Sequence, residues 1–263
     1  MKATVNGIEL DYELVGSGPC VTLAHSLACD LSMWDEQMDV LTRRYSVLRF
    51  DTRGHGGSSA PAGAYTLETM AGDVIALLDV LDIARTHFVG LSMGGMIGQH
   101  VALQAPQRLA SLVLADTTSR YPADVLPVWQ ERIRIVEEQG MEPMVEPTLA
   151  RWFTEPYRKS HPEVMARIGD LIRATPVAGY VGCCHAIPRL DITDRLRTVH
   201  LPVLVMVGDQ DAGTPVAMAR EIHGAIAGSQ LVVLHDAAHL SNIEQSAVFN
   251  RALLGFLDAQ RTL

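Results

Sequence analysis

The chain has 263 residues, of which 48% are hydrophobic, and it carries a formal net charge of −9. This length and apolar content suffice for one sizeable core, and an acidic chain without a lysine- or arginine-rich block argues against nucleic-acid binding. No segment approaches the roughly 20 apolar residues of a membrane-spanning helix, and the N-terminus lacks the apolar run of a signal peptide.

The first half of the chain predicts a hairpin followed by alternating strands and helices. Asn6-Gly7 lies between two β-prone stretches, which is a hairpin signal. A helical apolar pattern covers 66–81, with Thr66 as its N-cap, and a second helix runs over 93–106, where Pro106 ends it. Strands are predicted at 19–26, 45–54, 86–90 and 109–117.

The pattern changes between residues 121 and 187. Strand-like runs disappear there, and amphipathic helices such as 127–140 and 161–176 replace them. After Pro188 the alternation returns, with strands at 201–211 and 229–239 and helices at 216–228 and 247–260. We therefore expect an α/β fold with a mostly parallel sheet, formed by residues 1–120 and 188–263, and a helical lid formed by residues 121–187. Ligands of such sheets bind outside the carboxyl ends of the strands, which a lid would cover.

Ser92 lies in the segment GLSMG, which matches the pattern G-x-S-x-G. The segment follows a predicted strand and opens a predicted helix, as a nucleophile elbow requires. Small neighbours allow the sharp turn that exposes the serine hydroxyl, and the helix N-terminus favours negative charge developing beside it. The alternative is a glycine-rich helix that only packs close to a strand.

A serine hydroxyl needs a base and an acid that orients the base, and in this architecture they follow the serine along the chain. His239 lies at the end of the stretch 229–239, in the loop that follows its strand, and Asp211 lies at the tip of the preceding strand. His235 is the rival base. Asp209 and Asp116 are rival acids, but Asp211 is favoured over Asp209 because it lies further into its loop.

The oxyanion of an acyl transfer needs two aligned N–H donors. One is expected from Met93, directly after the serine, and the other from Leu27, in the loop after the strand 19–26. Ser26 could add a hydroxyl contact. The histidines show no metal-ligand spacing, and neither do the four cysteines, which we expect to be reduced thiols in a cytoplasmic protein. No metal or other cofactor is expected.

Together these residues resemble the α/β-hydrolase superfamily over essentially the whole chain, and most of all the 3-oxoadipate enol-lactonases. The motifs that carry the resemblance are HSL (25–27), DTRGHGGS (51–58), GLSMGG (90–95), GDQDAGTP (208–215) and AAHLSNIEQ (237–245). The resemblance implies Ser92, Asp211 and His239 as the triad, with Leu27 and Met93 as oxyanion donors. One departure concerns the substrate: the family's usual Asn-Ser-Leu-Gly is His-Ser-Leu-Ala here, and Ala28 replaces the glycine.

The resemblance implies hydrolysis of a small enol-lactone that bears a carboxylate, through an acyl-enzyme. In an acidic protein such a substrate needs a local cation, and we expect Arg151 and Trp152 to form a positive, aromatic wall. The other basic residues of the lid are Arg132, Arg134, Arg158, Lys159, Arg167 and Arg173.

Three alternatives remain open. A carboxylesterase or another lactonase of the same fold would use the same triad, and so would a perhydrolase. A ligand-binding receptor on a hydrolase scaffold would be a different class of protein. The partner expected is a small-molecule lactone or ester, and the sequence does not indicate an oligomeric state.

Overall fold

The computed structural model describes residues 1–260, and it contains an eight-stranded sheet in the order β1-β2-β4-β3-β5-β6-β7-β8. All neighbouring strands are parallel except at β2, which runs against both β1 and β4. The strands are β1 (Lys2–Val5), β2 (Ile8–Gly16), β3 (Cys20–Ala24), β4 (Ser46–Phe50), β5 (Thr86–Leu91), β6 (Leu109–Ala115), β7 (Val203–Gly208) and β8 (Gln230–Leu234).

The position of each strand in the sheet explains its sequence. β5 and β7 lie inside the sheet under helices, and every residue of both is buried, so they read as continuous apolar runs. β1 is at the edge and alternates exposed and buried residues. The predicted hairpin is confirmed: Val5 pairs with Ile8, and Asn6 and Gly7 both have positive φ, as a tight two-residue turn requires.

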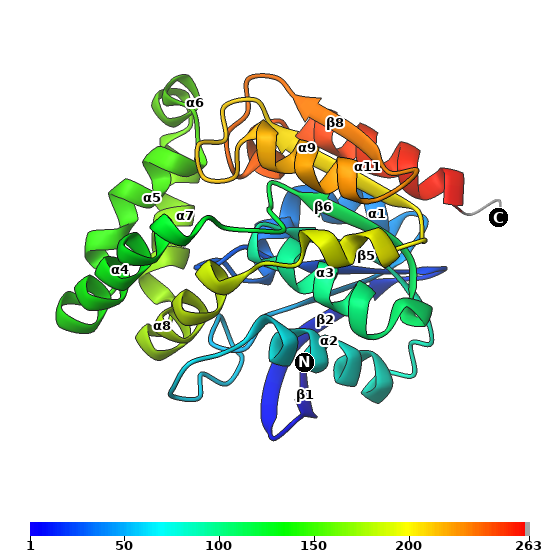
Figure 1. Cartoon of the computed structure of the whole chain (residues 1–263), viewed down its shortest axis with the longest axis horizontal. Coiled ribbons are helices and arrows are strands. Elements are labelled where there is room, and N and C mark those ends of the chain that lie inside the picture. The colour runs from blue at the N-terminus through cyan, green and yellow to red at the C-terminus, as the bar shows by residue number, and fades with distance from the viewer. Residues whose placement is uncertain (261–263) are drawn as a thin grey trace.

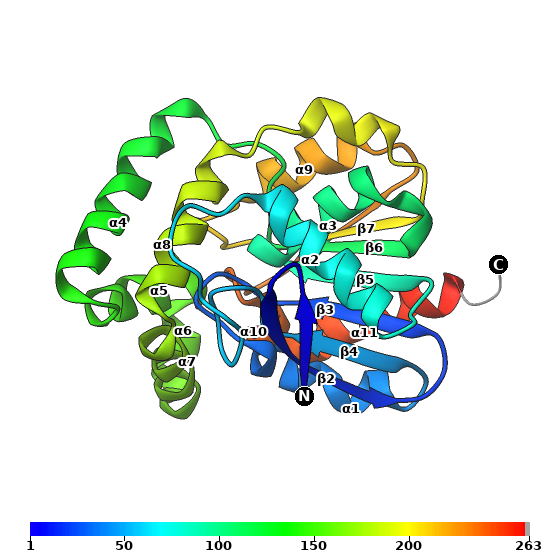
Figure 2. The ribbon, with the colours of Figure 1, turned by 90° about the horizontal axis from the view of Figure 1, so that it is seen from below.

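Helices cover both faces of the sheet, as Figure 2 shows. α2 packs on α3, and α3 packs on β5, whereas α1 packs on α11. The predicted N-cap of α2 is confirmed, because the Thr66 hydroxyl accepts from the Thr69 N–H. The α-helices outside the insertion are α1 (Asp35–Thr42), α2 (Leu67–Val80), α3 (Met93–Gln104), α9 (Val216–Ala225), α10 (Ser241–Glu244) and α11 (Ser246–Gln260).

A helical insertion separates β6 from β7 and lies to the left of the sheet in both views (Figures 1 and 2). Its helices are α4 (Leu126–Gln139), α5 (Val145–Trp152), α6 (Glu155–Ser160), α7 (Pro162–Ala174) and α8 (Val177–Ala186). At its base the Tyr121 N–H donates to the Leu190 carbonyl, and the Ile192 N–H donates to the Ser119 carbonyl. The lid that we propose, residues 121–187, begins at Tyr121 in this pairing and ends shortly before Leu190. In residues 1–260, no helix is both long and apolar enough to cross a membrane.

Candidate active site

Ser92 occupies a strained turn between β5 and α3. Its backbone has φ 55° and ψ −115°, a region that L-residues rarely adopt, and it forms the N-cap of α3. The turn is held on both sides, because the Ser92 N–H donates to the Ala115 carbonyl (2.9 Å) and the Thr117 hydroxyl donates to the Ser92 carbonyl (2.7 Å). The sequence therefore folds into a strand–turn–helix that presents one hydroxyl at the end of the sheet.

The glycines around Ser92 are required by close backbone approach. A Cβ on Gly90 would lie 2.2 Å from the Gly94 carbonyl oxygen, and one on Gly94 would lie 2.1 Å from the Ala24 carbonyl oxygen. Both clashes are with backbone, which cannot move aside as a flexible side chain could. Glycines flank the serine because the turn and the packing of α3 on the sheet leave no room for a methyl group at these positions.

Asp211 and His239 form a buried hydrogen-bonded pair, with the His239 Nδ1–H donating to Asp211 Oδ2 at 2.8 Å. The other carboxylate oxygen accepts from the N–H groups of Gly213 and Thr214, and the Thr214 hydroxyl donates to Oδ2. Burial raises the pKa of Asp211, but the charge and hydrogen bond of His239, with the Thr214 bonds, outweigh it and hold that pKa at about 2. Asp211 is therefore a fixed, ionised partner that selects the His239 tautomer with its proton on Nδ1.

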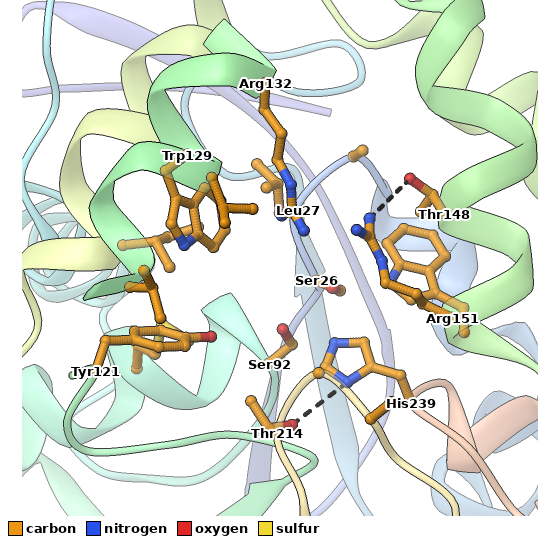
Figure 3. Close-up of a pocket in the computed structure, with 18 of the residues that line it drawn as sticks. Ser26, Leu27, Ser92, Tyr121, Trp129, Arg132, Thr148, Arg151, Thr214 and His239 are labelled. Atoms are coloured by element: carbon orange, nitrogen blue, oxygen red, sulfur yellow. Dashed lines mark hydrogen bonds between the residues drawn. The ribbon is translucent and has the colours of Figure 1, made fainter. Parts of the chain in front are cut away.

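His239 lies beside Ser92 in one cavity (Figure 3). Burial lowers the pKa of His239, but the charge of Asp211 and the hydrogen bond to it outweigh burial and raise that pKa above its ordinary value. Among the residues described, no hydrogen bond joins the Ser92 hydroxyl to His239. Such contacts are often long in free enzymes and shorten when substrate binds.

The rival base and acids occupy different surroundings. His235 is exposed and pairs with Asp209 at 3.0 Å, outside the cavity. Asp116 is fully buried and accepts from the Gly208 N–H (2.8 Å) and from the Ser241 hydroxyl. The geometry therefore favours Asp211 and His239 as the acid and base, with Asp116 as a bridge between the loops that carry them.

Asp116 makes stability depend on pH. Burial and the charge of Asp211 raise its pKa to about 8, far above the value in an unfolded chain. As pH rises from 4 to 8, the unfolded carboxyl ionises while the folded one keeps its proton, so folding loses about 1.4 kcal/mol per pH unit. Asn at this position keeps an acceptor for Gly208 and tolerates the positive φ of 44°.

We therefore expect Asp116→Asn to be more stable than the parent protein at pH 8, with the advantage shrinking by ~2 kcal/mol or more at pH 6. Denaturant unfolding at several pH values measures this difference directly. A difference in unfolding free energy that stays constant over this range would show that Asp116 is ionised in the folded protein.

The predicted oxyanion donors have no hydrogen-bond partner among the described residues. Neither the Leu27 N–H nor the Met93 N–H donates a hydrogen bond to another described residue, and Leu27 lines the cavity beside Ser92. Met93 is the first residue of α3, so its N–H is one of the groups that a helix start leaves unpaired. Both donors are thus available for a ligand oxygen.

Two buried imidazoles hold the loop that carries Leu27. His25 Nε2 accepts from the Thr52 N–H (2.9 Å), so its Nδ1 carries the proton and donates to the Ser26 carbonyl (2.7 Å). His55 Nε2 accepts from the Ala28 N–H (3.0 Å). Burial lowers the pKa of both residues, and that of His55 falls to about 3 with the help of His25. Both rings therefore stay neutral and keep accepting these N–H groups.

The cavity has a volume of about 240 Å³ and is roofed by the insertion. Three residues predicted to contact substrate line it: Ser26, Arg151 and Trp152. The Trp152 ring also stacks on His239, with centroids 6.3 Å apart. The remaining lining residues include Tyr121 and, from the insertion, Trp129, Arg132, Thr148 and Tyr180, whose convergence the sequence pattern did not indicate.

Two arginines project into this cavity from different helices, Arg132 from α4 and Arg151 from α5 (Figure 3). Arg151 is half-buried, and the hydrogen bond that its side chain donates to the Thr148 hydroxyl, at 3.4 Å, is its only one to a described residue. Arg132 lies over the Trp129 ring, 4.5 Å from its centroid. Neither forms an ion pair with a described residue, and no acidic residue lines the cavity, so the site is positive inside an acidic protein.

The other basic residues of the insertion do not line this cavity. Arg134, Lys159 and Arg173 form exposed ion pairs with acidic neighbours on the same helices or nearby. Arg158 lies at a separate hollow on the insertion. Among the described residues of the insertion, Arg132 and Arg151 are therefore the only arginines or lysines that line the cavity.

The sheet order, the strained turn at Ser92 and the hydrogen-bonded pair of Asp211 and His239 are together typical of hydrolases of the α/β type. A family model described as "alpha/beta hydrolase fold" matches residues 19–246, and the chain belongs to this family. The expected family membership and fold are thereby confirmed.

Several known proteins resemble the chain over its full length. It is 36% identical to 3-oxoadipate enol-lactonase 2 of Acinetobacter baylyi, covering 95% of this chain and 93% of that protein. The crystal structure of the enol-lactonase from Burkholderia xenovorans is 40% identical, with a TM-score of 0.95 over 98% of this chain and 100% of that one. A thermophilic esterase from Thermogutta terrifontis, solved with malate bound, is 31% identical, with a TM-score of 0.93 over 98% and 97%.

Proposed function

We propose that this hydrolase opens a small enol-lactone that bears a carboxylate, 3-oxoadipate enol-lactone giving 3-oxoadipate, through an acyl-enzyme on Ser92. The observation that carries the proposal is the pair of guanidinium groups without ion pairs, Arg132 and Arg151, in the cavity that holds Ser92 and His239. The similarity to two enol-lactonases supports the choice of substrate. The four free thiols favour a cytoplasmic setting.

In the first half of the reaction, His239 takes the proton of Ser92 as the hydroxyl oxygen attacks the lactone carbonyl. Asp211 keeps the accepting nitrogen of His239 free, because it holds the ring proton on Nδ1. The negative charge that develops on the carbonyl oxygen is met by the N–H groups of Leu27 and Met93, each worth about 3 kcal/mol.

In the second half, the tetrahedral intermediate collapses and the ring opens. His239 protonates the enolic oxygen that leaves, and tautomerisation of the enol to a ketone makes ring opening effectively irreversible. A water molecule activated by His239 then attacks the acyl-enzyme and releases the diacid. None of these steps uses a cofactor.

The substrate carboxylate is placed by the positive wall of the cavity. A guanidinium can donate two parallel hydrogen bonds to a carboxylate, and Arg151 has nearly all its donors free for this. Arg132, held over Trp129, supplies a second charge, and the rings of Trp129 and Trp152 provide apolar surface for the lactone ring. The bound malate of the esterase relative agrees with a fold that accepts carboxylates.

The alternative function is hydrolysis of a different small ester or lactone. One observation favours it: Ala28 lines the cavity with a positive φ of 59°, so its methyl group occupies space where the lactonase pattern has glycine. Steady-state rates on the enol-lactone and on p-nitrophenyl acetate test the two functions. We expect kcat/KM to favour the enol-lactone by at least about 100-fold, and a preference for the acetate would overturn the lactonase proposal.

Arg151→Ala should raise KM for the carboxylate-bearing lactone by about 10- to 100-fold, because a hydrogen bond to a charged group contributes roughly 1.5–3 kcal/mol. KM for neutral p-nitrophenyl acetate should change by less than about threefold, since that ester has no carboxylate to bind. Arg134→Ala is the matched control, because Arg134 is paired with Glu131 and Glu138 on the outer face of α4. Equal changes in KM for both substrates would contradict the proposed role of Arg151.

A further inference from the structure

Glu244 is a buried carboxylate in α10 that the proposed mechanism does not use. Both of its oxygens accept hydrogen bonds, and they reach in different directions. Oε2 accepts from the Ala238 N–H at 2.8 Å, directly before His239. Oε1 accepts from the Thr154 N–H at 3.0 Å and from the Thr154 hydroxyl, at the start of α6 in the insertion. One side chain therefore ties the loop of the base to the helices that roof the cavity.

Two further contacts join the same two segments. The Leu240 N–H, directly after His239, donates to the Trp152 carbonyl at 3.1 Å. The Trp152 ring stacks on the His239 imidazole, with an interplanar angle of 26°. Residues 238–240 and 152–154 are thus joined at three places by hydrogen bonds and ring contact, and Arg151 is the residue directly before this segment.

We infer that Glu244 is a positioning residue that fixes His239 and the Arg151–Trp152 segment relative to each other. His239 and the Arg151–Trp152 segment then keep the same relative position even when the other helices of the insertion move. Glu244 accepts all of these hydrogen bonds, so the link between the two sides needs a side chain with an accepting oxygen at both ends. This inference rests on the proposed function for the role of His239 as the base and for the role of Arg151 in binding a carboxylate.

Glu244→Gln tests the inference with little change in size. An amide has one accepting end, so its NH₂ must face an N–H donor on either the Ala238 side or the Thr154 side, and that side of the link breaks. We expect kcat for p-nitrophenyl acetate to fall at least fivefold as His239 loses its alignment. We also expect KM for the anionic mono-p-nitrophenyl glutarate to rise at least fivefold more than KM for the neutral acetate.

Thr154→Val provides a second variant, which removes the hydroxyl that donates to Glu244 and that also caps α6 by accepting from the Tyr157 N–H. It should move the same kinetic constants in the same direction, but less. The double variant should be no worse than Glu244→Gln alone, because both changes act on one link. Additive losses in the double variant would overturn the inference.

The matched control is Asp73→Asn, which neutralises another buried carboxylate, paired with Arg53 and Asn6 away from the cavity. It should lower the Tm while leaving the ratio of the two KM values and the kcat unchanged. If Glu244→Gln lowers the Tm but affects kinetics no more than Asp73→Asn does, Glu244 is merely structural. The acetate kcat and the double variant decide this even if the enol-lactone proves a poor substrate, so the two proposals can fail separately.

Discussion

Ser92→Ala is expected to lower kcat by about 10⁵- to 10⁶-fold, more than a substitution of the acid or of a substrate-binding residue. The variant loses the atom that forms the acyl-enzyme, whereas the N–H groups of Leu27 and Met93 remain to polarise a bound carbonyl. The backbone strain at position 92 is the same for alanine as for serine, so the fold should persist. Stopped-flow measurement with p-nitrophenyl acetate should show a burst of nitrophenol in the parent protein and none in the variant.

Ser26→Ala is the comparison variant for this experiment, because its hydroxyl lies in the same cavity. Ser26 can offer a substrate one hydrogen bond, so its loss should cost no more than about tenfold in kcat/KM. A burst that persists in Ser92→Ala, or a larger loss in Ser26→Ala, would mean that Ser92 is not the nucleophile.

Asp211→Asn is expected to lower kcat by about 10⁴-fold while leaving the fold intact. Oδ1 accepts from two backbone N–H groups, so the amide oxygen takes that place and the NH₂ group faces His239 Nδ1. The imidazole must then carry its proton on the other nitrogen, which can no longer accept the proton of Ser92. Steady-state kinetics and the Tm together separate this loss of tautomer control from unfolding.

The pH profile gives a second readout for the same variant. The proposed mechanism needs neutral His239, whose pKa Asp211 helps to raise, so we expect the activity of the parent protein to fall as pH drops through that raised value. The residual activity of Asp211→Asn should persist to lower pH. Asp209→Asn should leave the profile in place, because its partner His235 is outside the cavity. If Asp209→Asn shifted the profile and Asp211→Asn did not, Asp209 would be the acid that orients the base.

The parts of the fold that the sequence predicted correctly rest on local signals. The Asn6-Gly7 turn, the Thr66 cap and the apolar runs of the strands each depend on a few neighbouring residues, and the structure confirms them. The segment around Ser92 is only partly local: the clash that requires Gly90 is with Gly94 in the same turn, whereas the clash that requires Gly94 is with the Ala24 carbonyl in β3. The roles of Ser92, Asp211 and His239 remain predictions that the geometry supports.

Other parts of the site depend on packing between distant segments, which no local pattern encodes. Arg132 and Arg134 are two residues apart on α4, yet only the first faces the cavity. Asp116 and Glu244 look like ordinary acidic residues in the sequence, and their partners lie on other loops or in the insertion. The limits of α5 and α6 could not be set either, because short helices depend on tertiary contacts more than on their own periodicity.

The origin of each wall of the cavity has a consequence for how such a protein changes over time. The sheet and its loops carry the groups proposed to make and break bonds, whereas α4 and α5 carry the two guanidinium groups that would select an acid. Substitutions of Arg132 and Arg151 that leave Trp152 in place can therefore change which substrate is selected without moving Ser92, Asp211 or His239. Relatives of this fold that act on different substrates should therefore differ mainly in the helices of the insertion that line the cavity.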